Sequence, residues 1–178
     1  MKREEITPLF RSGHDACRFA YAYSSQQYAM TALAKMMKGG PCGSGRGLVG
    51  LDGAAIAGTV KRYVESMSFP APLAIACRHE LNREKLLQYA MLLVQFVMPA
   101  LGTGGHNRRM VHALVCLYFG IRDANGHKIK LADLCDKYDM SADTMTRRKS
   151  AAFKRLREIE SAAQVAIDER LKDGGLVE

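Results

Sequence analysis

The residues with the clearest capacity for chemistry are six basic side chains near the carboxyl end of the chain. The segment from Ser141 to Arg157 holds one acid, Asp143, and six cations: Arg147, Arg148, Lys149, Lys154, Arg155 and Arg157. Guanidinium and ammonium groups at this density bind phosphate, and arginine can also donate two hydrogen bonds to a guanine edge. The net charge of +8 over 178 residues favours an anionic partner but does not name it.

The spacing of these residues predicts a helix with two unlike faces. The apolar side comprises Met145, Ala152, Leu156 and Ile159. The polar side comprises Asp143, Arg147, Ser150, Lys154 and Arg157. On a helix of 3.6 residues per turn, the first set can pack inward while the second meets phosphates.

A shorter helix is expected immediately before it. Apolar residues recur at i, i+3, i+4 and i+7, in Leu131, Leu134, Cys135 and Tyr138. Asp139 can take the left-handed conformation that a tight turn needs, and Ser141 can cap the next helix with its hydroxyl. Two helices joined in this way, with the hydrophobic Met140 inside the turn, are typical of a helix-turn-helix, whose second helix enters the major groove.

Other chemistry has weaker support in the sequence. Two Cys/His pairs, Cys77 with His79 and His112 with Cys116, could each supply two metal ligands, but each lacks a second pair at zinc-site spacing. Nothing in the sequence identifies a base that would activate Cys42. We therefore expect no catalytic residue, no metal and no cofactor.

The segment 39–53, GGPCGSGRGLVGLDG, is rich in glycine. Gly45, Gly47 and Gly50 satisfy G-x-G-x-x-G, but no strand precedes them and no βαβ pattern surrounds them. A phosphate-binding loop would need a lysine and a hydroxyl residue where Arg46 and Gly47 stand. The segment is interpreted as a flexible connection.

Hydrophobic periodicity predicts an all-α fold, a helical bundle with the helix-turn-helix at its end. Helices are expected over about 14–38, 51–67, 82–98 and 107–120, and the last helix is expected to continue to about Lys172. The helix over 82–98 is apolar on nearly all sides and is expected to be the buried centre. We expect a helical region over 1–106 and a DNA-binding region over 107–178, packed as one compact unit.

The carboxyl-terminal region resembles region four of bacterial primary sigma factors, the domain that reads the −35 promoter element. The resemblance rests on the segments 131–135, 140–141 and 152–157, and on Leu117 to Ile121, which is similar to the arginine-aromatic-glycine-leucine segment that ends the preceding helix in that family. It covers about the last 65 residues. The sequence departs from the family at Lys130, Asp139 and Arg148, where the family has threonine, glycine and an apolar residue.

The resemblance implies a set of DNA-contacting residues. Positions that contact bases in the family fall on Ala142, Asp143, Thr144, Thr146 and Arg147, where the family's arginines are mostly absent, so a different DNA sequence is expected. Ala142 to Lys149, following the Ser141 cap and including Arg148, would lie in the major groove, with Arg147 facing a guanine. Lys154, Arg155 and Arg157 would bind phosphate.

The layout of the whole chain resembles the Q-type late antiterminators of phages and prophages. Residues 11–15, the glycine-rich middle and the segment 51–60 carry this resemblance, whereas 69–105 has no counterpart. It implies two partners: a double-stranded DNA site beside a late promoter, and a bacterial RNA polymerase with or without its sigma factor. An alternative is a protein-interaction module that binds RNA polymerase without base-specific DNA contacts, because region four also grips a flap of the polymerase.

Five cysteines without a repeated spacing are typical of reduced thiols in a cytoplasmic protein. The start of the chain lacks the apolar core of a signal peptide, and the longest apolar run, 86–98, is too short to span a bilayer. No membrane association is expected, and the oligomeric state is left open.

Overall fold

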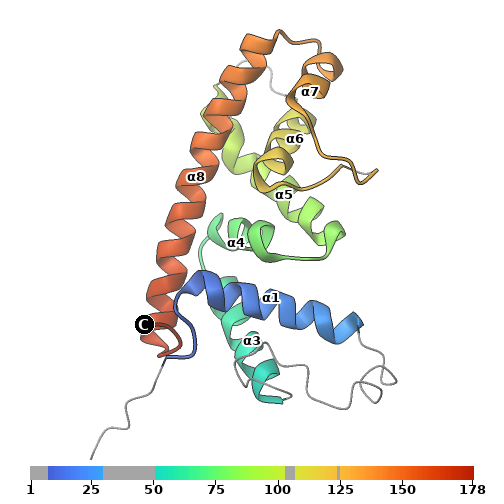
Figure 1. The fold of residues 1–178 in the computed structure, drawn as a ribbon. Coiled ribbons are helices and arrows are strands. Elements are labelled where there is room, and N and C mark those ends of the chain that lie inside the picture. The colour runs from blue at the N-terminus through green and yellow to red at the C-terminus, as the bar shows by residue number, and fades with distance from the viewer. Residues whose placement is uncertain (1–7, 30–50, 103–106, 124) are drawn as a thin grey trace, which may run out of the picture. The chain divides into compact units, whose positions relative to one another are not determined.

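A computed structural model of the chain describes residues 8–29, 51–102, 107–123 and 125–178. These residues form helices and no strand, which confirms the all-α class (Figure 1). The chain divides into two compact units, one made of Met1–Met67 and Gln164–Glu178 and the other of Ser68–Ala163. Helix α8 (Ala142–Asp173) contributes to both.

The first unit contains α1 (Gly13–Ala29), α3 (Leu51–Glu65) and the end of α8, and α1 packs against α3. Ser12 caps α1, because its Oγ accepts a hydrogen bond from the Asp15 amide at 3.3 Å. The Gly13 amide donates to Asp168 Oδ1 on α8 at 2.5 Å, and a Cβ at Gly13 would lie 2.5 Å from that oxygen. A side chain at this position would therefore force Asp168 to shift. Residues 30–38 of the expected first helix, and residues 39–50 of the glycine-rich connection with Cys42, lie outside the described residues.

The segment around Phe10 contacts the carboxyl-terminal residues of the chain within the first unit. The Leu176 amide donates to the Leu171 carbonyl at 2.8 Å, across Gly175 at a φ of 69°, and this bond ends α8. Phe10 and Val177, both buried, then form a parallel bridge. The last helix thus extends one residue beyond the expected Lys172.

The second unit contains α4 (Ala71–His79), α5 (Arg83–Val97), the 3₁₀ turn η1 (Met98–Leu101), α6 (Arg108–Phe119), α7 (Leu131–Lys137) and the first part of α8. Figure 1 shows α5, α6 and α7 beside the amino-terminal part of α8. All five helices contribute to one core, which includes Leu73, Cys77, Leu93, Val97, Met110, Leu114, Leu134, Met145 and Leu156.

Helix α4 lies between the helices expected over 51–67 and 82–98, in a stretch where the sequence predicted no helix. The helix begins at Ala71, directly after Pro70 and with Pro72 in its first turn. Proline is tolerated there because the amides of a first turn have no partner within the helix. The rest of α4 is apolar and buried, from Leu73 to Cys77.

Helix α5 begins where the sequence predicts, since Asn82 Oδ1 caps it by accepting from the Lys85 amide at 3.1 Å. The expectation that this helix forms the buried centre holds for one of its faces only. Ala90, Leu93, Val94 and Val97 are buried, but Met91 and Leu92 are 39% and 49% exposed. Within the described parts of the chain, no helix combines the length and the apolar content that crossing a membrane requires.

Along the chain, the boundaries of the two compact units fall between residues 67 and 68 and between residues 163 and 164. The sequence instead predicted a boundary between residues 106 and 107. The difference has a physical cause. Helix α5 packs against α6 across residue 106, and both helices contribute to the same core, so the chain does not separate there.

Candidate nucleic-acid interface

A tight connection of four residues, 138–141, joins α7 to α8. The Met140 amide donates to the Cys135 carbonyl at 3.0 Å, and the Asp139 amide donates to the Asp136 carbonyl at 3.4 Å. These two bonds form a Schellman motif, which requires a left-handed residue after the helix. Asp139 has a φ of 48°, so its predicted left-handed conformation is confirmed.

Ser141 caps α8, as its position in the sequence predicts. Its Oγ accepts from the Thr144 amide at 3.3 Å and donates to Thr144 Oγ1 at 2.9 Å. The Ser141 carbonyl accepts from the Met145 amide at 3.0 Å, which is the first bond of the helix ladder. The cap therefore fixes the residue at which α8 begins and the direction in which each of its side chains points.

The two predicted faces of this helix are confirmed. Met145, Ala152 and Leu156 are fully buried and Ile159 is 5% exposed. The outward face, here meaning Asp143, Arg147, Ser150, Lys154 and Arg157, is exposed throughout. Ala142, Thr144 and Thr146 are exposed as well. The start of α8 thus exposes two threonine hydroxyl groups and the Arg147 side chain.

Three of the six cations are half-buried and contact the protein itself. Arg148 directs one guanidinium nitrogen to the sulfur atoms of Met110 and Met140, each at 3.4 Å. Its side chain therefore lies on the inward flank of α8, where the sigma pattern has an apolar residue. A long aliphatic stem can cover apolar surface while the charged end stays near water.

Arg155 and Lys149 also have partners within the second unit. Arg155 Nε donates to the Phe96 carbonyl at 3.4 Å, and its Nη1 lies 3.3 Å from Glu158 Oε2. The Lys149 ammonium lies over the Phe153 ring, 5.3 Å from its centroid. The exposed cations on the outward face are thus Arg147, Lys154 and Arg157, which make no ion pair with any residue that the structure describes.

Glu160 anchors α8 to two other helices through contacts that sequence reasoning missed. Its two carboxylate oxygens accept hydrogen bonds from Arg78 on α4 at 2.5 and 2.9 Å, and Oε2 accepts a further one from the Tyr118 hydroxyl on α6 at 2.7 Å. The Arg78 guanidinium also lies over the rings of Tyr118 and Phe119. No local pattern predicts this network, because Arg78 and Tyr118 lie 82 and 42 residues from Glu160.

The network changes the acidity of its members. Burial alone would raise the pKa of Glu160, but the hydrogen bonds from Arg78 and Tyr118 outweigh it and lower that pKa. Burial, together with the bond to the Glu160 carboxylate, raises the pKa of Tyr118 to about 12. Near neutral pH the pair is therefore a carboxylate and a neutral phenol, and the phenol donates.

The predicted Cys/His pairs do not form a metal centre among the described residues, where no three His, Cys, Asp or Glu side chains converge on one point. Cys116 Sγ lies 3.6 Å from His112 Nε2, which is 3.3 Å from the Leu87 carbonyl oxygen. Burial raises the pKa of Cys116 to about 12 and lowers that of His112. Burial also raises the pKa of Cys77, so neither thiol is a thiolate at neutral pH.

Comparisons of this chain with known proteins give no match. No protein-family model matches the chain, and no curated protein and no solved structure is similar enough to match it.

Proposed function

We propose that the chain is a sequence-specific DNA-binding regulator of transcription, with α7 and α8 acting as a helix-turn-helix. In this proposal the amino-terminal part of α8 enters the major groove. Arg147 makes a bidentate contact to guanine, and Lys154 and Arg157 bind the phosphates on either side. Ser141, Ala142, Thr144 and Thr146 lie close enough to the groove to contact base edges or the backbone.

The observation that carries the proposal is the outward face of α8. Arg147, Lys154 and Arg157 lie on one side of the helix, exposed and without an ion-pair partner among the described residues. An isolated exposed cation is common, but three on one face in the first half of a capped helix, after a short helix and a tight turn, match the plan of a DNA reader.

The regulatory role is proposed as antitermination at a phage or prophage late promoter, in the cytoplasm of a bacterial cell. It rests on the resemblance to sigma region four and on the Q-type layout of the chain. The DNA site would lie beside the promoter, and the second partner would be RNA polymerase, with or without its sigma factor.

A second candidate is a module that binds RNA polymerase without reading bases. It is favoured by the side chains at the start of α8, where Ala142 and Thr144 offer fewer donors than the arginines of the sigma family. Arg148 and Arg155, which are directed at the protein itself, reduce the number of cations available to DNA further.

Selection from genomic DNA separates the two candidates. The purified protein is mixed with sheared DNA of its source genome at low and at moderate salt, and the bound fragments are sequenced. A specific regulator enriches one site near a promoter, and the position of that site bears on antitermination. Uniform retention that disappears with salt supports the polymerase-binding alternative instead.

Two substitutions then test the assignment of residues. Arg147→Ala should cost about 1 to 3 kcal/mol of binding to the selected site and reduce the preference at one base pair. Lys154→Ala should weaken selected and random DNA about equally and lower the dependence of log K on log salt by about one. Lys172→Ala, an exposed lysine in the last turn of α8, is the control and should change neither. If Arg147→Ala weakens selected and random DNA alike, Arg147 does not read a base.

A further inference from the structure

The second unit contains a cavity of about 1300 Å³ that the proposed DNA interface does not use. Its lining residues come from α5, α6, the segment 122–130 and α7 with the following residue Tyr138, and none of them belongs to α8. The cavity is therefore separate from the outward face of α8. Because four segments of the chain bound this space, it fits a compact ligand better than an extended one.

The floor of the cavity is apolar. It is formed by Leu87, Met91, Leu92, Ala113 and Leu134. Met91 and Leu92 are the residues of α5 that are unexpectedly exposed, at 39% and 49%. Exposed apolar side chains that line a concave surface favour ligand binding. Covering them lowers the free energy by about 25 cal/mol per Å² of apolar surface buried.

The rim of the cavity is predominantly basic. The lining includes five permanent cations against two carboxylates, and all five cations are exposed: Arg109, Arg122, Lys128, Lys130 and Lys137. One carboxylate and one cation are bonded to the protein itself: Asp123 Oδ1 accepts from the amides of Asn125 and His127 at 2.9 and 2.8 Å, and Arg122 donates to the Gly126 carbonyl. The positive charges come from three separate segments and surround the same space.

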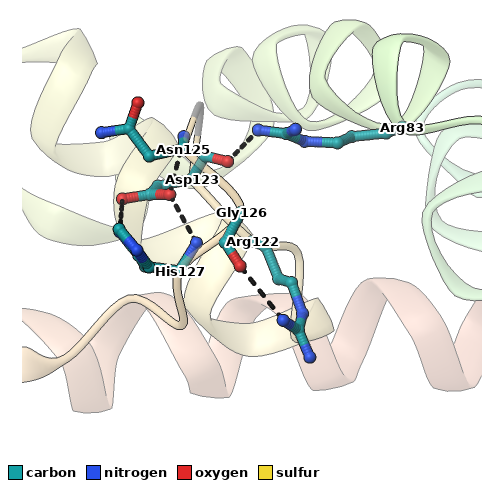
Figure 2. Close-up of polar contacts among 6 residues, drawn as sticks. All are labelled: Arg83, Arg122, Asp123, Asn125, Gly126 and His127. Carbon is teal, nitrogen blue, oxygen red and sulfur yellow. Dashed lines mark hydrogen bonds and ion pairs between the residues drawn. The ribbon is translucent and has the colours of Figure 1, made fainter.

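The loop that carries part of this rim is held in place by hydrogen bonds. Figure 2 shows Arg83 of α5 directed at the Asp123 carbonyl and Arg122 directed at the Gly126 carbonyl, the latter at 3.1 Å. The Asp123 carboxylate lies at the centre of the turn. These bonds hold Arg122 and the backbone at Asp123, Gly126 and His127 in place before any ligand arrives, which lowers the entropic cost of ordering this part of the rim.

We propose that this cavity binds a small organic anion with an apolar body, such as a molecule with an aliphatic or aromatic part and one carboxylate, sulfonate or phosphate group. The apolar part lies on Leu87, Met91 and Leu92, and the anionic group lies against the cations of the rim. A nucleic acid would not cover the apolar floor, and a neutral apolar molecule would leave the basic rim unused. This proposal is independent of the DNA-binding function.

The probe for the test is 1-anilinonaphthalene-8-sulfonate, a small apolar anion whose fluorescence rises when it is shielded from water. Titration of the full chain at pH 7 should give saturable binding with one site per chain. N-phenyl-1-naphthylamine, which has the same rings and no sulfonate, should bind about tenfold more weakly because it gains nothing from the rim. Equal affinities of the two dyes would exclude the anionic part of the proposal.

Substitutions locate the site. Leu92→Glu puts a negative charge on the floor and should weaken the sulfonate probe about tenfold or more, whereas Leu81→Glu, at a residue 61% exposed and outside the cavity, should leave it unchanged. Lys128→Ala with Lys130→Ala should weaken the probe about fivefold, and Lys172→Ala should not. Thermal melts of each variant establish that it is folded. Unchanged binding in a folded Leu92→Glu variant would overturn the proposal.

Competition separates a small molecule from a protein segment of similar chemistry. Sodium dodecanoate should displace the probe and raise the melting temperature of the wild-type chain but not that of Leu92→Glu. If an acidic amphipathic peptide displaces the probe and dodecanoate does not, the cavity is a docking site for a protein helix and the proposed ligand class is wrong.

Discussion

The inward flank and the outward face of α8 both carry basic residues but differ in what those residues contact. Arg148 and Arg155 contact sulfur atoms, a backbone carbonyl and a neighbouring glutamate within the same unit. Arg147, Lys154 and Arg157 are exposed and make no ion pair among the described residues. The cation count of a helix therefore overstates its binding surface, because some of the charge is already engaged by the fold.

The largest effect is expected where the two faces meet at neighbouring residues. Leu156 is fully buried and Arg157 is exposed. Leu156→Ala should lower the free energy of unfolding by about 2 to 5 kcal/mol, through lost burial and the cavity left behind. Arg157→Ala should change it by less than about 0.5 kcal/mol. Urea denaturation measures both. A comparable loss in the two variants would mean that Arg157 has a structural role, and the distinction between the faces would fail.

The two acids of α8 that pair with arginine should differ in the same way. Glu160→Ala should cost about 1 to 2 kcal/mol, because it removes three hydrogen bonds and leaves Arg78 without its carboxylate, although the exposure of both side chains, 37% and 28%, reduces the loss. Glu158→Ala, whose partner Arg155 lies at 3.3 Å in a more exposed pair, should cost about 0 to 0.5 kcal/mol. Equal losses in urea denaturation would mean that Glu160 is no more than a surface ion pair.

The dependence of stability on pH distinguishes the charge of Glu160 from its packing. Its pKa in the folded chain lies below the ordinary value of 4.5, so its contribution is present above that pH and is lost as the pH falls through the folded pKa. Glu160→Gln should therefore be less stable than the wild type at pH 7, and the difference should shrink below about pH 4.5. Unfolding free energies at several pH values measure this. If the difference in unfolding free energy stays constant down to pH 3, the loss of stability comes from the shape of the Glu160 side chain and not from its charge.

The features that the sequence predicted are those that depend on neighbouring residues. The cap at Ser141, the left-handed Asp139 and the phase of α8 follow from local hydrogen bonding and from the period of the helix. The features it missed depend on pairs far apart in the chain. The Glu160 network, the inward direction of Arg148 and the cavity beneath the 122–130 loop each require the packed helices, and no single segment encodes them.

The smallest effects are expected at the turns that set where each helix ends. Gly120 and Asp139 occupy equivalent left-handed positions after α6 and α7, with φ of 69° and 48°. A Cβ at Gly120 would meet no atom within 4 Å, so Gly120→Ala should cost about 1 kcal/mol from backbone conformation alone. Asp139→Gly removes that strain but adds freedom to the unfolded chain, and the two terms should leave a gain of no more than about 0.5 kcal/mol.

Thermal or urea unfolding of both variants tests this difference, with Gly58→Ala as a control inside α3, where a Cβ also meets no atom within 4 Å. That control should stabilise the chain by about 0.5 to 1 kcal/mol, because alanine favours the helix over glycine. If Asp139→Gly instead destabilises the chain by more than about 1 kcal/mol, the Asp139 side chain contributes a contact to the α7–α8 connection. In that case the start of α8, and with it the direction of Arg147, depends on this residue and not on the backbone motif alone.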